Sequence, residues 1–583
     1  METIDRASPS FRHTVGTYVH RKTAIQNEVT ITDLLFISRK PSASFVIEGL
    51  FKKQMPTVTR RISRRGHGFI EDKVLSSNGE VMSHSQKNRY RWSQINWRKL
   101  ERSVFKLQKR VYRASQQGDI ANVHNLQRLL VRSKSAKLLA TRQVSQKNKG
   151  KRTAGVDGVK SLNNKQRLEM AMHLNLNSKS KPIRRILIPK PDRLEMRPLG
   201  IPTLEDRAKQ ALAKIALEPQ WEAKFEADSY GFRPGRSCQD AIQAIFLSIY
   251  KSNKFILDAD IRGCFDNINH SALLGKLETF PKIRSAIKGW LKAGIMDGRV
   301  YFKPKAGTPQ GGVISPLLAN IALHGLGHDT ANALTEELKQ HLKIVHNRQD
   351  KVRALSTLRI IRYADDFLVI HENEDIVKKA KIFIETWLKK IGLELNTAKT
   401  KIVHTLNPYN GNKPGVDFLG FHIRQFFAKD RKLGYKTIIK PTIAGQRRHR
   451  KCIRKYIKRL AAATQEQVIK LLTPIIKGWA NYYRSYVARK AFESADKYVF
   501  ICLWKWARWR HPNKGLKWIK NQYFRKYRNS NWRFMTSSNE VLTVHSDIHI
   551  KRHVKVQGHR SPYDGDLKYW ARRMSRKAVK RYA

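Results

Sequence analysis

The amino-acid sequence predicts an α+β fold, with amphipathic helices and short strands in different stretches of the chain. Residues 92–133 place apolar side chains at spacings of three and four, the period of helices that bury one face. Residues 181–204, 255–260 and 358–370 contain short apolar runs bounded by polar turns, which is typical of strands. With 41 % hydrophobic residues and 32 glycines, the chain has the apolar share of folded globular domains.

The net charge of the chain indicates a polyanionic partner. The chain carries 115 Lys and Arg against 46 Asp and Glu, a formal net charge of +69. Neutralising phosphates with such residues releases counterions, so an excess of this size favours nucleic-acid binding. The 12 Trp and 19 Tyr are more stacking and core-building aromatics than a ribosomal protein needs for neutralising phosphate.

Length and cysteine content narrow the class further. A chain of 583 residues is expected to form three or four domains. Its cysteines, Cys238, Cys264, Cys452 and Cys502, lie far apart and form no Cys-x-x-Cys pair, so neither a zinc ribbon nor a disulfide framework is expected. No apolar run is long enough to cross a bilayer. We therefore expect an intracellular, soluble protein that binds neither membrane nor zinc.

Residues 1–91 are expected to be a poorly ordered N-terminal extension. Short apolar runs at 34–37 and 45–51 are mixed with Ser, Thr and Arg without a sustained period. A basic, hydroxyl-rich start is also typical of organellar transit peptides, but Glu2 and Asp5 occupy positions where those peptides avoid acids.

Two basic elements follow the extension. The spacing in 92–133 predicts a pair of amphipathic helices. Their basic side either faces phosphate or is simply exposed to solvent. The apolar runs 186–188 and 199–201 flank a polar turn and predict a hairpin, which taken alone is only a soluble edge. The basic residues of this hairpin are Arg184, Arg185, Lys190, Arg193 and Arg197.

The most informative positions are acids that interrupt apolar strands. Asp365 and Asp366 break the run 358–370 at its centre, and the run that begins at Phe255 leads to Asp258 and Asp260. Burying a carboxylate without a partner costs several kcal/mol of folding free energy. A hairpin turn that exposes these acids to solvent would be sufficient to avoid that cost. The alternative hypothesis is a catalytic one, in which Asp365 lies at a β-turn and shares two Mg²⁺ ions with Asp260. Carboxylates, water and phosphates are the ligands that Mg²⁺ prefers. Such a metal pair activates an attacking hydroxyl and neutralises a leaving pyrophosphate.

A glycine-rich turn lies between the two acidic strands. Residues 307–320 read GTPQGGVISPLLAN, a turn that opens an apolar helix. The two glycines after Gln310 permit a ligand to approach the backbone closely. Without its neighbours, the segment would be an ordinary junction between a loop and a helix.

The order of these motifs resembles one family. From about Trp92 to the C-terminus, the chain is similar to the reverse transcriptases encoded by group II introns. The motifs that carry the resemblance are GVDG at 155–158, IPKP at 188–191, RPLGIP at 197–202, SYGFRPGRS at 229–237, LDADIRGCFDNI at 257–268, GTPQGGVISPLLAN at 307–320, RYADDFLV at 362–369, GLELNTAKTK at 392–401 and DFLGF at 417–421. Beyond them, IIKGWANYYRSY at 475–486 resembles the maturase domain, and SPYDGDLKYWARR at 561–573 resembles the DNA-binding domain of the family.

The resemblance implies a right-hand polymerase fold, with fingers and a palm built on an antiparallel sheet. It implies a helical thumb or maturase X domain and a small basic C-terminal DNA-binding domain. The expected parts are an N-terminal extension at 1–91, an N-terminal region with fingers at 92–254, a palm at 255–439, a thumb at 440–525 and a DNA-binding domain at 526–583. Relatives continue into a zinc-containing HNH endonuclease, and because the sequence holds no cysteine pair, we expect that activity to be absent.

The family also implies roles for individual residues. Asp260, Asp365 and Asp366 would be catalytic metal ligands, joined by the carbonyl of Ile261. Phe265 would be the steric gate that excludes a ribose 2′-OH. The remaining implied contacts to the nucleotide come from Gln310, Lys399, Lys190 and Arg197. The turn between Lys190 and Arg197 is one residue longer than the family pattern, which makes the reach of Lys190 less certain than that of Arg197.

Two further segments bear on nucleic-acid binding. Basic residues crowd the start of the thumb, where Arg447, Lys451, Arg454 and Lys458 recur at helical spacing. Because these cations have no acid among them, they predict an RNA-binding stripe rather than a solvated face. His545, His549 and His553 recur every four residues, but the alternation around them predicts a strand, in which they would be solvated or face phosphate, too far apart for one metal.

Together these features predict an RNA-directed DNA polymerase that also acts as an intron RNA maturase. It would assist splicing and copy intron RNA into DNA during homing, with Mg²⁺, dNTPs, group II intron RNA and target DNA as partners. The alternative is an RNA-binding maturase with a vestigial polymerase site. A third interpretation, a retron-like reverse transcriptase, is disfavoured by the thumb motif. The Lys- and Ile-rich composition favours a plastid or mitochondrion over a bacterial cytoplasm.

Overall fold

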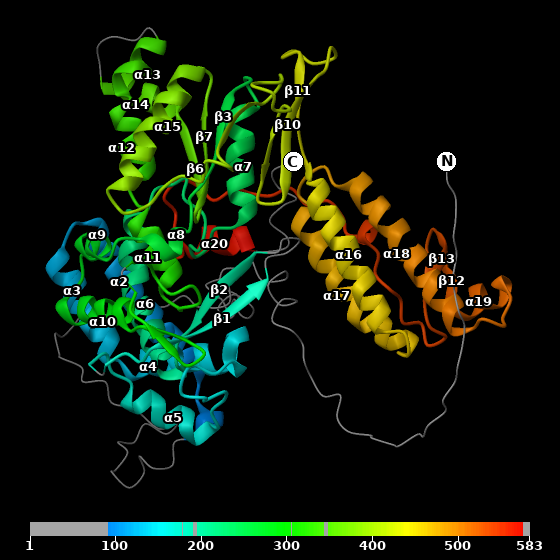
Figure 1. The fold of residues 1–583 in the computed structure, drawn as a ribbon, viewed down its shortest axis with the longest axis horizontal. Helices are drawn as coiled ribbons and strands as arrows, with labels where there is room; N and C mark the ends of the chain where they lie inside the picture. The colour runs from blue at the N-terminus through cyan, green and yellow to red at the C-terminus, as the bar shows by residue number, and fades with distance from the viewer. Residues whose placement is uncertain (1–90, 178, 190–194, 305, 343–347, 575–583) are drawn as a thin grey trace, which may run out of the picture. The chain divides into compact units, whose positions relative to one another are not determined.

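The protein is described by a computed structural model that covers residues 91–574, apart from residues 178, 190–194, 305 and 343–347 (Figure 1). The predicted N-terminal extension, except Arg91, lies outside the described residues, as do Lys190 and Arg193. Among the described helices, none is long and apolar enough to span a membrane.

The predicted amphipathic helical pair is confirmed as α2 (Trp97–Gln116) and α3 (Ile120–Arg132). Asn96 and Asp119 cap them, each side chain accepting a hydrogen bond from a backbone N–H of the first turn. Their apolar faces are buried in the largest core, although Leu129 is 46 % exposed. The same core includes residues of α4 (Lys134–Arg142) and the buried α6 (Leu204–Lys224), and Met170 of α5 (Asn164–His173) packs against it.

The predicted basic hairpin is also confirmed. Strands β1 (Ile183–Pro189) and β2 (Met196–Ile201) pair antiparallel, with Ile188 opposite Arg197. Two short strands, β4 (Ile295–Asp297) and β5 (Val300–Phe302), extend this sheet in the order β2-β1-β4-β5.

The second sheet carries the acidic positions and is buried on both faces. Its order is β6-β7-β3-β8, with β3 at Phe255–Asp260, β6 at Arg359–Tyr363, β7 at Asp366–His371 and β8 at Lys401–His404. Every pair is antiparallel, as predicted. Leu257 packs in the core with α15 (Glu374–Lys389), whereas the next residue back, Ile256, packs in the core with α7 (Cys238–Ile249). Successive side chains of a strand point to opposite faces of the sheet, so both faces are packed against a core. Polar groups can then be placed at the edge of the sheet.

Further helices and a third sheet complete this part of the chain. The helices are α8 (Cys264–Asn267), α9 (His270–Lys276), α10 (Pro281–Lys292), α11 (Ser315–Ala322), α12 (Leu326–Ala333), α13 (Thr335–Leu342) and α14 (Arg348–Thr357). The third sheet has the order β11-β10-β9, with β9 at Val416–Phe418, β10 at Phe421–Phe427 and β11 at Tyr435–Pro441.

A separate core holds the helices that follow. It joins α16 (Ile443–Arg459), α17 (Gln465–Tyr483) and α18 (Arg489–Arg510). The same core includes residues of α19 (Leu516–Tyr523) and the hairpin of β12 (Phe524–Tyr527) and β13 (Ser530–Phe534). Phe534 and Leu542, which lie beyond residue 525, are therefore packed with the helices that precede it.

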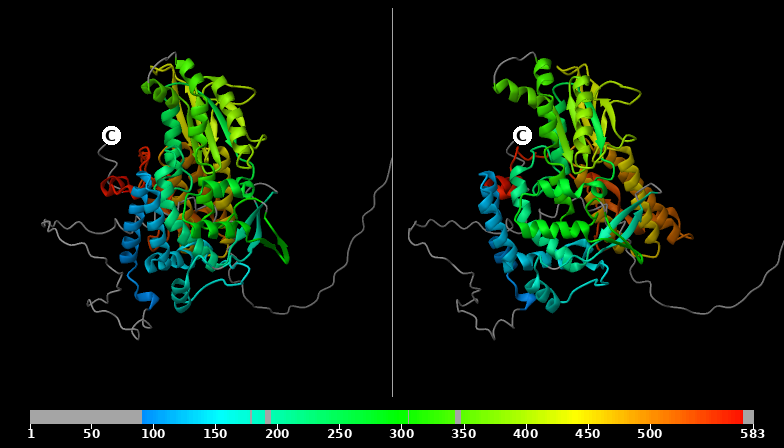
Figure 2. Two further views of the ribbon diagram at one scale, coloured as in Figure 1. Left: turned by 90° about the vertical axis from the view of Figure 1, so that its left-hand side faces the viewer. Right: turned by 60° about the vertical axis from the view of Figure 1, so that its left-hand side comes forward.

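The chain then returns to the N-terminal helices. The 3-10 turn Pro562–Asp564 places Tyr563 against α2, with ring centroids 6.0 Å from Phe105 and 6.4 Å from Tyr112. Helix α20 (Leu567–Met574) follows, and Figure 2 shows this red segment beside the blue α2. Residues more than 400 positions apart thus share one packing surface.

The strand predicted for the three histidines is wrong. His545 lies in a 3-10 turn (His545–Asp547) and is fully buried. Its Nδ1 lies 2.6 Å from Asp496 Oδ1, and its Nε2 lies 2.7 Å from His449 Nε2. His553 contacts Asp240, and His549 alone is exposed. Buried carboxylates on other elements draw two of the rings inward, which the local alternation of residues does not reveal.

Candidate active site and nucleic-acid-binding helix

Three carboxylates meet at one edge of the second sheet. Asp260, the last residue of β3, pairs in register with Asp366, the first residue of β7. Asp365 is the second residue of the two-residue turn between β6 and β7, and the first, Ala364, has a φ of 61°. The structure therefore brings Asp260, Asp365 and Asp366 to the same sheet edge, with Asp365 in the predicted β-turn.

A buried arginine holds this turn from behind. Arg362 Nη1 donates to the Ala364 carbonyl at 3.1 Å and to Asn320 Oδ1 at 3.0 Å. Asn320 Nδ2 in turn donates to the carbonyl of Gly231 at 2.8 Å. A Cβ on Gly231 would lie only 2.3 Å from Ala364 N, so only glycine permits this approach. Sequence reasoning missed all three residues as supports of the site, although an arginine inside an apolar strand was a signal.

Asp260 is compensated by groups from the segment before β8. Lys399 Nζ forms an ion pair with Asp260 Oδ2, and Asn396 Nδ2 donates to the same oxygen at 3.3 Å. The Asp260 side chain remains 21 % exposed. In the part of the chain that the structure describes, no three His, Cys, Asp or Glu side chains converge as a metal site. The three carboxylates share an edge, but their oxygens do not form a ready metal cluster.

The predicted gate residue lies next to this edge. Phe265, in the short helix α8, makes an edge-to-face contact with Phe232, with ring centroids 6.3 Å apart. Ile261, just after β3, is buried and forms an isolated antiparallel bridge with Leu395. Burial raises the pKa of Asp258, on the same face of β3 as Asp260, to about 6, with Lys401 opposing the shift and Asp417 adding to it.

The glycine-rich turn packs onto the segment after β3. Gln310 Nε2 donates to Asp266 Oδ2 at 2.8 Å. A Cβ on Gly307 would lie 2.4 Å from the Asp266 carbonyl oxygen, and Gly307 has a φ of 89°. Burial raises the pKa of Asp266, while Gln310, Arg185 and Arg197 lower it. Gln310 is therefore held against the segment that follows β3.

The same turn also touches the basic hairpin. The Gly200 N–H donates to the Gln310 carbonyl at 2.6 Å, and a Cβ on Gly311 would lie 2.5 Å from the Gly200 carbonyl oxygen. Arg197, on β2, is exposed, and its charge acts on Asp266. The structure thus brings Arg197, Gln310 and Phe265 into one neighbourhood with the acidic edge, while Lys190 lies outside the described residues.

The predicted cationic stripe lies on one face of α16. All four of its members are exposed: Arg447, Lys451, Arg454 and Lys458. Ile453 and Ile457 on the opposite face are buried in the core with α17 and α18. Arg450, which is not in the stripe, points to α18 and donates to Ser494 Oγ at 2.7 Å. The stripe is therefore exposed and lies outside the core that α16 shares with α17 and α18.

Comparisons with known families agree with this architecture. Residues 188–423 match reverse transcriptase (RNA-dependent DNA polymerase), residues 92–174 match the N-terminal domain of reverse transcriptase, and residues 446–524 match the maturase-specific domain of group II introns. The Escherichia coli protein YkfC is 32 % identical over 309 residues, which cover 48 % of this chain and 78 % of YkfC. The chain belongs to the family of group II intron-encoded reverse transcriptases and maturases.

Other members of this family match different lengths of the chain. The group II intron-encoded protein LtrA of Lactococcus lactis subsp. cremoris is 35 % identical over 292 residues, which cover 42 % of this chain and 47 % of LtrA. The chain thus spans about half the length of LtrA. Maturase-like protein 1 of Euglena gracilis is 28 % identical over 402 residues, covering 67 % of this chain and 76 % of that protein. Apo telomerase from Candida tropicalis superposes with a TM-score of 0.31 at 16 % identity, over 42 % of this chain and 54 % of the telomerase chain.

Proposed function

We propose that this protein is an RNA-directed DNA polymerase that also binds group II intron RNA and assists its splicing. The observation that carries the polymerase activity is the register of β3 and β7, which sets Asp260 opposite Asp366 and beside the turn with Asp365. A vestigial site would have no need of three acids at one edge, nor of a buried arginine and a glycine that hold their turn.

The chemistry of this edge fits Mg²⁺, which takes hard oxygen ligands. Asp260, Asp365, Asp366 and the carbonyl of Ile261 would hold two ions, and Asp260 would exchange its ion pair with Lys399 for the metal. The bound metals would lower the pKa of the attacking primer hydroxyl and neutralise the leaving pyrophosphate. Lys399, freed from Asp260, would then be near enough to neutralise charge on the leaving pyrophosphate.

The neighbouring residues would select and orient the nucleotide. Phe265 would exclude the ribose 2′-OH of an rNTP, and Gln310 would lie against the incoming base and sugar. Arg197 would grip the triphosphate with its planar fork of donors, and Lys190 would join it. The substrates would be dNTPs, an RNA template and a DNA primer.

The corresponding domains would be those of a right-hand polymerase. Fingers would extend from the N-terminal region at 92–254, the palm would occupy 255–439 and the thumb 440–525, with residues 526–583 contacting target DNA. Intron RNA would bind the cationic stripe of α16, because phosphate neutralisation by exposed cations supplies most of nonspecific affinity. Relatives of the chain come from bacteria, yeast and Euglena, and the composition of the chain supports our proposal that it acts in an organelle.

The polymerase activity is tested by primer extension on an RNA template with Mg²⁺. Asp260→Asn and Asp365→Asn should each lower extension by about a hundredfold or more, because each removes a ligand for charge that develops in the reaction. Asp430→Asn, an exposed carboxylate in the loop after β10, is the matched control and should extend normally. Mn²⁺ binding followed by its electron paramagnetic resonance should weaken in the first two variants alone. Inactive wild-type protein across a range of Mg²⁺ and salt would favour the maturase-only function.

The RNA-binding role is tested by reversing the stripe. Arg447, Lys451, Arg454 and Lys458 changed to Glu should weaken intron RNA binding and lower the slope of log K against log salt by about three units. A matched reversal of four lysines of and just after α15, Lys378, Lys379, Lys389 and Lys390, changes the net charge equally on the palm. If both quadruple variants bind RNA with equal affinity and salt slope, the stripe is only a solubilising surface.

A further inference from the structure

The loop of residues 228–237, between α6 and α7, lies between two parts of the molecule that are distant in sequence. We call it the palm loop because it packs against the β6–β7 turn of the proposed palm, although its residues belong to the proposed N-terminal region with fingers. One side of it contacts the β6–β7 turn with the candidate catalytic acids, and the other side contacts residues 553–573, which we call the C-terminal segment. The loop is therefore a physical link between that segment and the acidic edge.

On the catalytic side, the palm loop is bonded to β6 backbone to backbone. Tyr230 N donates to the Arg362 carbonyl at 2.8 Å, and Arg362 N donates to the Asp228 carbonyl at 3.0 Å. Gly231 lies directly against Ala364, where no Cβ fits. Phe232, in the left-handed region with a φ of 59°, contacts the ring of Phe265. A shift of this loop would move both the turn and the candidate gate.

On the opposite side, the C-terminal segment encloses the palm loop. Arg236, which is fully buried, donates to the carbonyl of Gly558 at 2.8 Å and to that of Arg560 at 3.4 Å. A Cβ on Gly235 would lie 2.7 Å from the ring of Trp570, itself buried. Lys555 Nζ reaches the Tyr230 hydroxyl at 3.5 Å. These contacts leave the loop little room to move away from β6.

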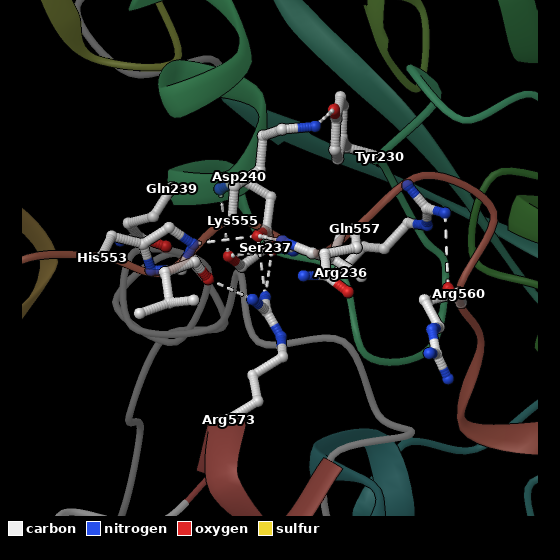
Figure 3. A network of polar contacts seen from close by, with 12 residues as sticks. Tyr230, Arg236, Ser237, Gln239, Asp240, His553, Lys555, Gln557, Arg560 and Arg573 are labelled. Atoms are coloured by element: carbon white, nitrogen blue, oxygen red, sulfur yellow. Dashed lines mark hydrogen bonds and ion pairs between the residues drawn. The ribbon is translucent and has the colours of Figure 1, made fainter. Parts of the chain in front are cut away.

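Asp240, at the start of α7, anchors the C-terminal segment (Figure 3). Its carboxylate has no exposed surface and accepts hydrogen bonds from Arg573 Nη2 at 2.7 Å on both oxygens. His553 Nε2 lies 2.9 Å from Oδ1, and Val556 N donates to Oδ1 at 2.8 Å. Asp240 also completes the capping box of α7 with Ser237, the last residue of the palm loop. One carboxylate thus joins the loop to both ends of the segment.

We propose that the C-terminal segment is a positioning element of the polymerase site, which holds the palm loop against the β6–β7 turn and Phe265. The proposal rests on the proposed polymerase function and deepens it. Arg573 and His553 act through Asp240 and the palm loop and touch no reacting atom. The segment would thus serve polymerisation on any template, besides any contact it makes with target DNA.

The expected signature is a loss of chemistry rather than of primer-template binding. Misplacing catalytic groups by about 1 Å costs on the order of a hundredfold in rate. Arg573→Gln should therefore lower kcat for dNTP addition by about tenfold or more, raise KM for dNTP, and raise incorporation of rNTP relative to dNTP. Arg573→Lys should recover part of kcat, since an ammonium keeps the charge but not the planar group that bonds Asp240 through Nη2 and the Val554 carbonyl through Nη1.

The experiment compares full-length variants on a short primer-template, with melting curves to confirm folding. Arg552→Gln, an exposed arginine next to His553 and outside the segment, is the matched control and should behave as wild type. His553→Gln is a milder change and should shift kcat, KM for dNTP and rNTP incorporation in the same directions by smaller factors. Normal kcat and rNTP discrimination in folded Arg573→Gln would overturn the proposal, as would an equal loss in Arg552→Gln.

A second measurement separates this proposal from the proposed function. Hydrogen exchange of residues 228–237 should accelerate in Arg573→Gln and not in Arg552→Gln, whether or not the wild-type protein polymerises DNA. If the wild-type protein does not polymerise DNA but exchange in the loop is still faster in Arg573→Gln, the proposed polymerase function is refuted. The contact between the C-terminal segment and the palm loop is then still supported. Unchanged exchange in this loop would refute the positioning role even if the enzyme is active.

Discussion

Asp240 and Asp260 are two aspartates of the same part of the chain that the protein treats in opposite ways. Asp240 has no exposed side-chain surface and is surrounded by Arg573, His553 and backbone N–H groups. These groups hold the pKa of its carboxyl well below the usual range, against the effect of burial. Asp260 lies at a sheet edge with 21 % of its side chain exposed and one lysine beside it.

The difference teaches which carboxylate is structural and which can take an external cation. The charges around Asp240 come from the chain itself, and their geometry leaves no lone pair for a metal. Asp260 is held by Lys399, which has 46 % of its side chain exposed and which a divalent cation would displace in the proposed polymerase site. The burial of a carboxylate therefore indicates its role only when the groups that neutralise its charge are also known.

The largest effect should come from Asp240. Asp240→Asn leaves Arg573, 10 % exposed, without its counter-charge and should lower the free energy of unfolding by about 3–5 kcal/mol. Asp260→Asn should change it by about 1 kcal/mol or less, because an exposed pair contributes little. Urea denaturation at neutral pH measures both. Equal losses in the two variants would contradict the distinction.

A pair of glycines tests the two sides of the palm loop. Gly231→Ala would force a Cβ against Ala364 N and displace the β6–β7 turn, so extension should fall by about a hundredfold. Gly235→Ala, where φ is 72° and the Cβ would meet Trp570, should loosen the C-terminal segment, lower the melting temperature and lower extension by about tenfold, less than Gly231→Ala does. Primer extension and thermal melting on both variants give the comparison. An extension defect confined to Gly235→Ala would reverse the assignment.

A third, smaller effect is a pH dependence that comes from α16, where the buried imidazole of His449 is neutral in the folded state. Burial lowers the pKa of His449 to about 3, with the charge of His545 and Arg450 adding to the shift and Asp496 opposing it. Its imidazole stacks on Trp479, with centroids 4.5 Å apart. In the unfolded chain the pKa returns to about 6.5, so protons bind the unfolded state preferentially below that value.

His449 therefore stabilises the fold above about pH 6.5, and this contribution is lost as the pH falls toward 3. Between pH 6.5 and 5 the loss should be about 2 kcal/mol. His449→Phe keeps a ring on Trp479 and should flatten this part of the curve of unfolding free energy against pH. An identical slope in wild type and variant would show that the ring titrates normally in the folded state.

The smallest effect concerns the candidate gate. Phe265→Val should open space beside the sugar and raise rNTP incorporation relative to dNTP by about tenfold, the worth of a few methylene-sized contacts. Single-nucleotide addition with matched rNTP and dNTP measures the ratio. Phe232→Leu removes only the ring that supports Phe265 and should give a weaker form of the same change. An unchanged ratio in both would make Phe265 a core residue.

The sequence was sufficient for the strands, the hairpin and the acidic edge, because each is marked locally. A β-branched run interrupted by Asp365 and Asp366 indicates a turn, and a second run that ends at Asp260 can pair with it in few ways. The α16 stripe was equally predictable, since a period of 3.6 places its cations together. Family resemblance then supplied roles that local pattern alone does not give.

The contacts of the C-terminal segment could not be predicted in this way. Arg573 is one of 115 basic residues, and it lies 333 positions from the carboxylate it binds. Likewise the alternation around His545 and His553 resembled a strand because their partners, Asp496 and Asp240, are distant in sequence. Buried ion pairs of this kind depend on tertiary folding and leave no periodic trace.

The return of residues 553–573 to the palm loop also sets an order of events during synthesis. A ribosome exposes the chain from its N-terminus, and the sheet with the acidic edge emerges long before the segment that encloses its supporting loop. Closing a contact across 333 residues carries the entropy of a long loop and is a late step in folding. A nascent chain would therefore expose the cations of α16 before the loop that supports its acidic edge is fully held, and under the proposed function it could bind RNA before it could synthesise DNA.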